Sequence, residues 1–131
     1  DNCLAGGKKS YHTIIPGFLL KDGAAVGPFG VMGAFMQPQG QVEVLVSTID
    51  YHMNPQEALD APRIQWIGGR RLELEREAGE AIADELRAMG HEVTVVDDRI
   101  SMGRGQIIWR GEDGVYTAGT EPRCDGAVAA W

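Results

Sequence analysis

Two apolar segments joined by Asp22-Gly23 constrain the fold of this chain more than any other feature of the sequence. Residues 11–21 and 25–35 are both rich in apolar side chains, and Asp-Gly between two such runs is a strong signal for a β-hairpin. Pro16 interrupts the first run, which predicts an edge strand or a bulge. The second run is apolar and glycine-rich throughout, so we expect a strand that is buried on both faces.

Three helices are predicted beyond this hairpin. Apolar residues recur at three- and four-residue spacing over residues 41–53, and residues 37–40 are expected to form the preceding turn. Asn54-Pro55 supplies an N-cap and a first-turn proline for a short helix over residues 56–60. A third helix is expected over 78–89, where Gly90 suits the position after its end. Further strands are expected at residues 63–66, 71–75, 92–96, 106–110 and 115–118. Because helices do not alternate with single strands, the order favours one α+β domain over residues 1–131 with a mixed or antiparallel sheet.

Charge and composition exclude several classes of function. The net charge is −7, and the only basic doublets are Lys8-Lys9 and Arg70-Arg71, so the chain lacks the basic stripe that nucleic-acid binding requires. No apolar run approaches the ~18 residues of a membrane span. No two histidines have ligand spacing, so we expect no metal site. We also expect no cofactor. Cys3 and Cys124 are expected to be two unpaired thiols.

The best candidate for a chemical site is the segment 31–35, where a strand ends in small residues before a helix. Small residues let a substrate approach the backbone, so amide N–H groups can face a developing oxyanion. The helix N-terminus that follows favours negative charge. The alternative is a tightly packed buried strand without a chemical role.

His12-Thr13 is the second candidate. Neighbouring residues on a strand face opposite sides, so His12 is poorly placed to activate the hydroxyl of Thr13. This pattern favours two polar groups beside a cleft, with one pointing in, over a catalytic pair. His52 and His91 lie beside predicted helix ends and are expected to be ordinary surface or capping residues.

Two Pro-Arg turns, residues 60–63 and 121–126, each place an arginine beside a carboxylate. Bidentate Arg–carboxylate pairs would pin these loops to the body of the fold. The alternative is recognition of a substrate carboxylate by one of the arginines.

Several motifs together resemble the γ-glutamyltransferase (γ-glutamyltranspeptidase) family of N-terminal-nucleophile hydrolases, in the C-terminal part of the small subunit. Their order and spacing match that family, and the Asn-Pro-x-Glu-Ala-x-x-Ala-Pro-Arg run is specific. The motifs are residues 11–17, 21–23 and 27–40, the run 54–63, residues 103–106 and residues 121–126.

The resemblance implies a four-layer αββα fold in which an N-terminal Thr is both nucleophile and base. Such enzymes cleave γ-glutamyl amides such as glutathione and pass the glutamyl group to water or an amino acid. The oxyanion-hole pair of glycines falls on Gly33 and Ala34, and the second position departs from Gly. The adjacent serines that contact the substrate fall near His12 and Thr13, of which only Thr13 keeps a hydroxyl.

The family's nucleophile matches nothing in residues 1–131, so we expect the chain alone to be an inactive fragment. Its expected partners are a large subunit and the rest of the small subunit, and an incomplete sandwich would expose apolar surface and favour a homo-oligomer. Two alternatives stay open: a non-catalytic binding or assembly module on the same fold, and part of an acylase for β-lactam side chains. A periplasmic, extracellular or cytoplasmic parent is equally compatible with the sequence.

Overall fold

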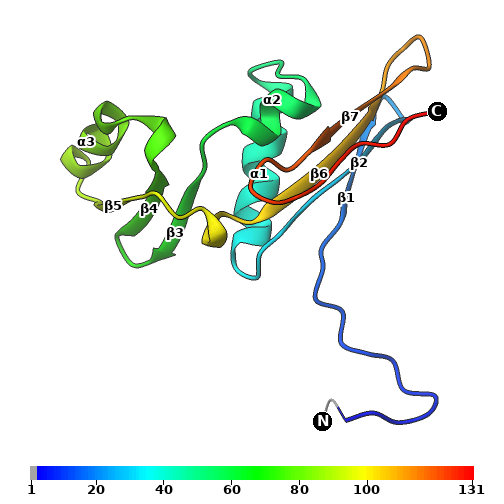
Figure 1. The fold of residues 1–131 in the computed structure, drawn as a ribbon, viewed down its shortest axis with the longest axis horizontal. Coiled ribbons are helices and arrows are strands. Elements are labelled where there is room, and N and C mark those ends of the chain that lie inside the picture. Colours follow the sequence, from blue (N-terminus) through cyan, green and yellow to red (C-terminus); the bar gives the residue numbers. More distant parts are fainter. Residues whose placement is uncertain (1–2) are drawn as a thin grey trace.

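The computed structural model describes residues 3–131, which form two sheets and three α-helices (Figure 1). The larger sheet is antiparallel and has the order β1-β2-β6-β7. Its strands are β1 (Gly17–Lys21), β2 (Ala24–Met32), β6 (Arg104–Arg110) and β7 (Tyr116–Thr120). The smaller sheet is mixed, because the central β4 pairs antiparallel with β3 and parallel with β5. Its strands are β3 (Ile64–Gly68), β4 (Arg71–Glu75) and β5 (Glu92–Val96).

The helices are α1 (Met36–Ile49), α2 (Pro55–Asp60) and α3 (Glu80–Ala88), with short 3₁₀ helices η1 (Arg76–Ala78) and η2 (Ile100–Met102). Helices α1 and α2 pack on the four-stranded sheet, and α3 packs on the smaller sheet at the other end of the molecule (Figure 1). The expected α+β class with mixed and antiparallel sheets is confirmed.

The predicted hairpin is present, but its first strand is shorter than expected. Strand β1 begins at Gly17, lies at the sheet edge and carries a bulge between Leu19 and Leu20. Residues 11–16 were expected to belong to this strand and do not. Pro16 has no N–H to offer to a neighbouring strand. Before it, the backbone of Thr13 and Ile15 bonds to side chains of α1.

The expectation that the second hairpin strand is buried on both faces is wrong. In β2, Phe29 and Val31 are buried whereas Pro28 and Met32 are exposed, because α1 and α2 cover only one face of the sheet. The core lies on the covered face, where the ring centroids of Phe29 and Trp109 are 5.8 Å apart. The core cluster comprises Phe29, Val31, Val44, Ala58, Leu59, Ile107 and Trp109.

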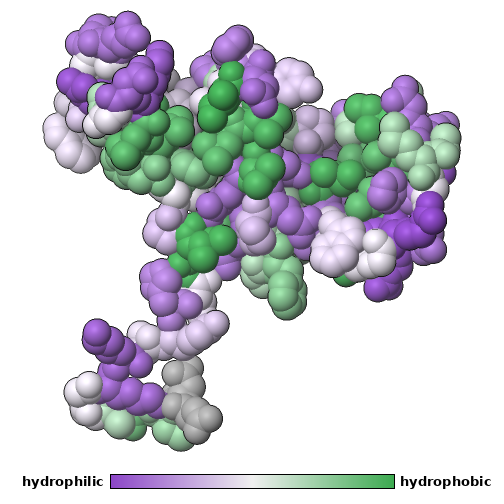
Figure 2. All heavy atoms as spheres, turned by 180° about the vertical axis from the view of Figure 1, so that it is seen from behind, coloured by the Kyte–Doolittle hydropathy of each residue, from purple (hydrophilic) through white to green (hydrophobic). Residues whose placement is uncertain are grey.

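The opposite face of this sheet leaves large apolar side chains exposed. They include Phe18, Leu20 and Ile108, which are 58%, 59% and 43% exposed. Hydrophobic surface is visible over the body of the molecule when it is seen from behind (Figure 2).

Helix α1 begins at Met36, so residues 37–40 form its first turn and not the predicted loop. Pro38 is tolerated there because N–H groups of a first turn have no intrahelical partner. Gly40 is needed for close packing, since a Cβ at this position would lie 2.7 Å from a methyl group of Val31. Helix α2 begins as predicted, with a capping box between Asn54 and Glu57.

Helix α1 also joins the two sheets through the outer edge of β3. The Trp66 N–H donates to Oε1 of Gln39 at 2.7 Å, and Nε2 of Gln39 donates to the Trp66 carbonyl at 3.3 Å. One helical turn later, Oε1 of Glu43 accepts the N–H of Ile64 at 3.1 Å. Polar side chains of a helix thus satisfy an edge strand that would otherwise be open to pairing.

Candidate active-site turn

The turn between β2 and α1 presents two backbone donors. The carbonyls of Gly33 and Ala34 accept the N–H groups of Met36 and Gln37 at 2.8 and 3.1 Å, which closes the turn onto the helix. Within residues 3–131, the N–H groups of Gly33 and Ala34 themselves have no acceptor. Two adjacent free donors beside a helix N-terminus are a suitable arrangement for stabilising an oxyanion.

The backbone of this turn is unusual at both positions. Gly33 has φ of 141°, and a Cβ there would lie 2.9 Å from Cα of Gly103 and 3.2 Å from Cβ of Met36. Only glycine fits this close approach. Ala34 has φ of 50°, so it adopts the left-handed conformation that glycine prefers, at a cost of about 1–2 kcal/mol. Position 34 therefore adopts a conformation that favours glycine although its residue is alanine.

Behind the turn lies a buried arginine. Nη1 of Arg63 donates to the carbonyls of Met102 and Gly103 at 2.8 and 3.1 Å. Nη2 of the same guanidinium donates to Oε2 of Glu121 at 2.8 Å, and that oxygen also accepts the N–H of Gly105 at 2.6 Å. Since Gly103 packs against Gly33, the Arg63 guanidinium supports the segment between η2 and β6 that lies behind the turn.

A second buried arginine completes this network. Arg123 donates to Oε1 of Glu75 at 2.6 Å and to Oε1 of Glu121 at 2.7 Å, and also bonds Oε2 of Glu75. It donates further to the carbonyls of Leu59 and Ala61 at 2.8 and 2.9 Å. The prediction that arginines pin the two Pro-Arg loops is confirmed. The partner of Arg63, however, is the glutamate of the other loop and not its neighbour Asp60.

Electrostatics agree with a structural role for these charges. Burial and the neighbouring Arg123 lower the pKa of Arg63, with Glu121 opposing them. Burial would raise the pKa of Glu75, but hydrogen bonds from Arg123 and the Arg63 N–H outweigh it and hold the pKa below its usual value. The side chains of Arg63 and Arg123 are only 2% and 1% exposed, so neither faces a solvent-accessible substrate.

The other two candidates, His12 and Thr13, lie in the extended segment before β1 and are exposed. The Thr13 carbonyl accepts Nε2 of Gln37 at 2.8 Å, and the Gln37 N–H in turn bonds the Ala34 carbonyl. The structure thus links Thr13 to the Gly33-Ala34 turn through one intervening residue. His12 makes no hydrogen bond or ion pair with any other residue in the described chain.

Sequence reasoning missed Gln37 and Gln41, which hold the segment of Thr13. The available signal was the alternation of glutamine at 37, 39 and 41, which places 37 and 41 on one helix face and 39 on another. That signal was hidden because residues 37–40 were expected to form a turn.

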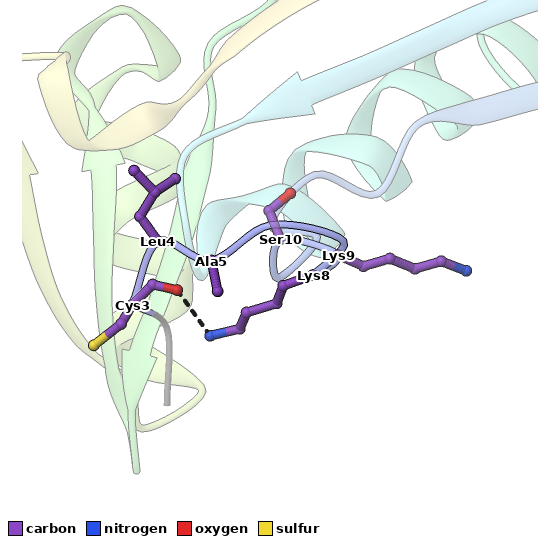
Figure 3. Close-up of a pocket in the computed structure, with 6 residues that line it drawn as sticks. All are labelled: Cys3, Leu4, Ala5, Lys8, Lys9 and Ser10. Atoms are coloured by element: carbon purple, nitrogen blue, oxygen red, sulfur yellow. Dashed lines mark hydrogen bonds between the residues drawn. The ribbon is translucent and has the colours of Figure 1, made fainter.

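Elsewhere in the molecule, the hollow in Figure 3 is lined only by residues of the N-terminal tail, where Nζ of Lys8 donates to the Cys3 carbonyl at 3.1 Å. No part of the folded body contributes to it. Cys3 and Cys124 are free thiols. Residues 3–131 contain no cluster of three or more His, Cys, Asp or Glu side chains that could hold a metal ion. Within the same range, no helix has both the length and the hydrophobicity that a bilayer span requires.

The fold is that of N-terminal-nucleophile hydrolases. The structure resembles cephalosporin acylase from Bacillus halodurans with a TM-score of 0.89 and 56% identity, over 98% of this chain and 24% of that one. It also matches the γ-glutamyltranspeptidase of Pseudomonas nitroreducens with a TM-score of 0.78, over 99% of this chain and 68% of that one; at 23% identity this match shows the fold alone.

The family model for gamma-glutamyltranspeptidase matches residues 1–131, and the chain belongs to this family. Among curated relatives, the glutathione hydrolase-like YwrD proenzyme of Bacillus subtilis is 34% identical over 97% of this chain and 25% of its own length. The acylase ACY 1 proenzyme of Pseudomonas sp. strain SE83 is 35% identical over 97% of this chain and 22% of its own length. The chain therefore spans about a quarter of the proenzymes that it matches.

Proposed function

We propose that this chain is the C-terminal part of the small subunit of a γ-glutamyltransferase-like enzyme that transfers or hydrolyses γ-glutamyl groups. Gly33 and Ala34 supply the oxyanion hole, and Thr13, with His12 beside it, contributes to the substrate pocket. The nucleophile, an N-terminal Thr, comes from a part of the enzyme outside residues 1–131. The observation that carries this proposal is the pair of backbone N–H groups without acceptors at Gly33 and Ala34.

The chemical role of this turn follows from where charge develops. Attack on an amide carbonyl converts its oxygen into an oxyanion, and fixed N–H donors stabilise that charge more than the neutral ground state. A donor of this kind contributes about 10²–10³ in kcat. Backbone hydrogen bonds to Met36 and Gln37 hold this turn against α1, and donors that are already in place cost no reorganisation during the reaction.

The first experiment compares the 131-residue chain with the complete proenzyme, using a γ-glutamyl anilide as substrate. We expect turnover by the processed proenzyme and none above the buffer blank by the chain alone. In the processed enzyme, a tetrahedral phosphonate analogue of the substrate should shift the amide ¹⁵N and ¹H signals of Gly33 and Ala34. Unmoved signals with the analogue bound would reject the oxyanion role.

A second candidate function is an acylase that removes side chains from β-lactams. It is favoured by the 56% identity with the Bacillus halodurans cephalosporin acylase. Ratios of kcat/KM for an N-acyl cephalosporin and a γ-glutamyl anilide separate the two. If the proenzyme turns over neither substrate, the non-catalytic module is favoured.

The expected partners are the large subunit and the rest of the small subunit. They would cover the open face of the four-stranded sheet, which is the face that exposes Phe18, Leu20 and Ile108. In their absence, we expect copies of the chain to associate through this face, because exposed apolar patches favour association. Light scattering should show a dimer or larger species. Ile108→Lys should reduce its mass, whereas Ile82→Lys on α3, where the native side chain is similarly exposed at 48%, should not. A monodisperse monomer at high concentration would contradict the homo-oligomer.

A further inference from the structure

Helix α1 holds the extended segment before β1 with two glutamines on one of its faces. Gln37 makes two bonds, since its Nε2 donates to the Thr13 carbonyl at 2.8 Å and its Oε1 accepts the Ile15 N–H at 3.2 Å. Nε2 of Gln41 donates to the Ile15 carbonyl. Three backbone groups of the segment, the Thr13 carbonyl and the N–H and carbonyl of Ile15, are therefore bonded to side chains of a helix instead of to a neighbouring strand.

The spacing explains why a helix can replace a strand here. Residues four apart on a helix are separated by roughly 6 Å along its axis. Residues two apart on an extended chain are separated by roughly 6.6 Å. Gln37 and Gln41 thus match Thr13 and Ile15 almost in register. The same geometry recurs on another side of α1, where Gln39 and Glu43 bond Trp66 and Ile64 of β3.

Gln37 also contacts the Gly33-Ala34 turn through its backbone. Its N–H donates to the carbonyl of Ala34 at 3.1 Å while its side chain bonds Thr13 and Ile15. A single residue therefore bridges the turn that carries the two free donors and the segment that carries Thr13. Because the same glutamine binds both the turn and the segment, the distance between the turn and the segment is restrained.

We propose that Gln37 is a positioning residue, which sets the place of the Thr13 segment relative to the Gly33-Ala34 turn, with Gln41 as the second anchor. The inference rests on the proposed function of those two elements. Gln37 acts through Thr13 and the turn, and its side-chain amide is occupied by backbone groups. In the absence of a strand partner for residues 13–15, this contact orients one wall of the substrate pocket.

Three variants test the proposal. Gln37→Met keeps the length of the side chain and removes both bonds. Gln37→Glu keeps an acceptor for the Ile15 N–H and loses the donor to the Thr13 carbonyl. Gln39→Met is the matched control, because Gln39 makes the same kind of paired contact with Trp66 and not with the segment.

Amide hydrogen exchange of the 131-residue chain provides a readout that is independent of activity. We expect Gln37→Met to accelerate exchange at Ile15 about tenfold while leaving Trp66 unchanged, and Gln39→Met to do the reverse. Gln37→Glu should retain protection at Ile15. Exchange at Ile15 that is unaffected by Gln37→Met would overturn the anchoring contact.

Steady-state kinetics of the processed proenzyme test the positioning role. A misplaced pocket wall weakens the binding of substrate and transition state alike, which raises KM with little change in kcat. We expect KM to rise at least fivefold in Gln37→Met, with partial rescue in Gln37→Glu and no change in Gln39→Met. An active wild-type enzyme whose KM is unaltered by Gln37→Met would refute the positioning role. An inactive wild-type proenzyme would instead refute the proposed function, and the positioning role with it.

Discussion

Arg63 and Glu121 form a buried ion pair, in which Nη2 of the arginine donates to Oε2 of the glutamate at 2.8 Å. Their side chains are 2% and 0% exposed. The pair joins the two Pro-Arg loops, which lie 58 residues apart in the chain, and places the other arm of Arg63 on the carbonyl of Gly103. A single residue, Gly103, therefore separates the ion pair from Gly33 in the candidate active-site turn.

Replacing Glu121 by glutamine should be strongly destabilising. Two buried arginines are balanced by Glu75 and Glu121, so removing one carboxylate leaves an uncompensated positive charge. Removing one partner from a buried pair costs about 3–5 kcal/mol. Urea unfolding of the chain at pH 7 measures the loss.

The control for Glu121→Gln is Asp97→Asn, which removes a carboxylate from an ion pair at the surface. Arg76 and Asp97 are 59% and 74% exposed, so solvent screens their attraction. We expect a much smaller change in the free energy of unfolding. Equal losses in the two variants would show that the buried network contributes no more than a surface pair.

Ala34→Gly should stabilise the fold. Glycine at φ of 50° relieves strain of about 1–2 kcal/mol, and its greater freedom in the unfolded chain offsets about 0.5–1 kcal/mol. The net change expected in the free energy of unfolding is a gain of up to about 1.5 kcal/mol. Ala25→Gly, in β2, removes the same methyl group at a position without positive φ and should destabilise. A loss of stability in Ala34→Gly would mean that the strain is absent.

Asn54→Ala should cost about 1 kcal/mol, because the Asn54 side chain accepts the N–H groups of Gln56 and Glu57 at the start of α2. Asn54→Asp keeps the acceptor and should leave the free energy of unfolding within about 0.5 kcal/mol. Thermal unfolding followed by circular dichroism measures both. The role of the cap would be disproved if alanine and aspartate behaved alike.

The parts of the fold that sequence could predict are those determined locally. Asp22-Gly23 fixes a hairpin, and Asn54 with Glu57 fixes a helix start, through contacts within three residues. The start of α1 was predicted five residues too late, because Pro38 and Gly40 are typical of turns. Their presence in a helix depends on position in the first turn and on the close approach of Val31.

The candidate site also has a part that the sequence predicts and a part that only the structure shows. The glycine and alanine of the turn are visible in the sequence because small residues precede a helix. The contacts that hold the turn and the Thr13 segment join residues far apart in the chain: Gln37 and Thr13 are 24 residues apart, and Arg63 and Gly103 are 40 apart. No local sequence pattern predicts which polar side chain bonds to which distant backbone group, so only the structure shows these contacts.

Glu43 should make stability depend on pH near neutrality. Burial raises the pKa of this carboxyl to about 7, partly opposed by the hydrogen bond from the Ile64 N–H and by the charges of Arg63 and Arg123. Its Oε2 is buried without a hydrogen-bond partner among residues 3–131. In the unfolded chain the pKa is about 4.3. Between these two values the folded state holds a proton that the unfolded state has lost.

The sign of the effect follows from this difference in bound protons. Where the folded state binds more protons, the free energy of unfolding falls as pH rises. The contribution of Glu43 is therefore fully present below about pH 4.3, declines between about pH 4.3 and pH 7, and is lost above that range. The lowered pKa of Glu75 acts in the opposite direction, and only at acid pH, where stability falls as that carboxylate is protonated.

Glu43→Gln tests this assignment, since glutamine keeps an acceptor for the Ile64 N–H and cannot ionise. Urea unfolding at pH 5.5 and pH 8 should show a smaller decrease in stability for the variant than for the wild type. Glu73→Gln, on the neighbouring strand β4, removes a glutamate that is not fully buried and should leave the wild-type decrease unchanged. If Glu43→Gln and the wild type lost the same free energy between these pH values, Glu43 would be ionised throughout the range and its burial would not control its protonation.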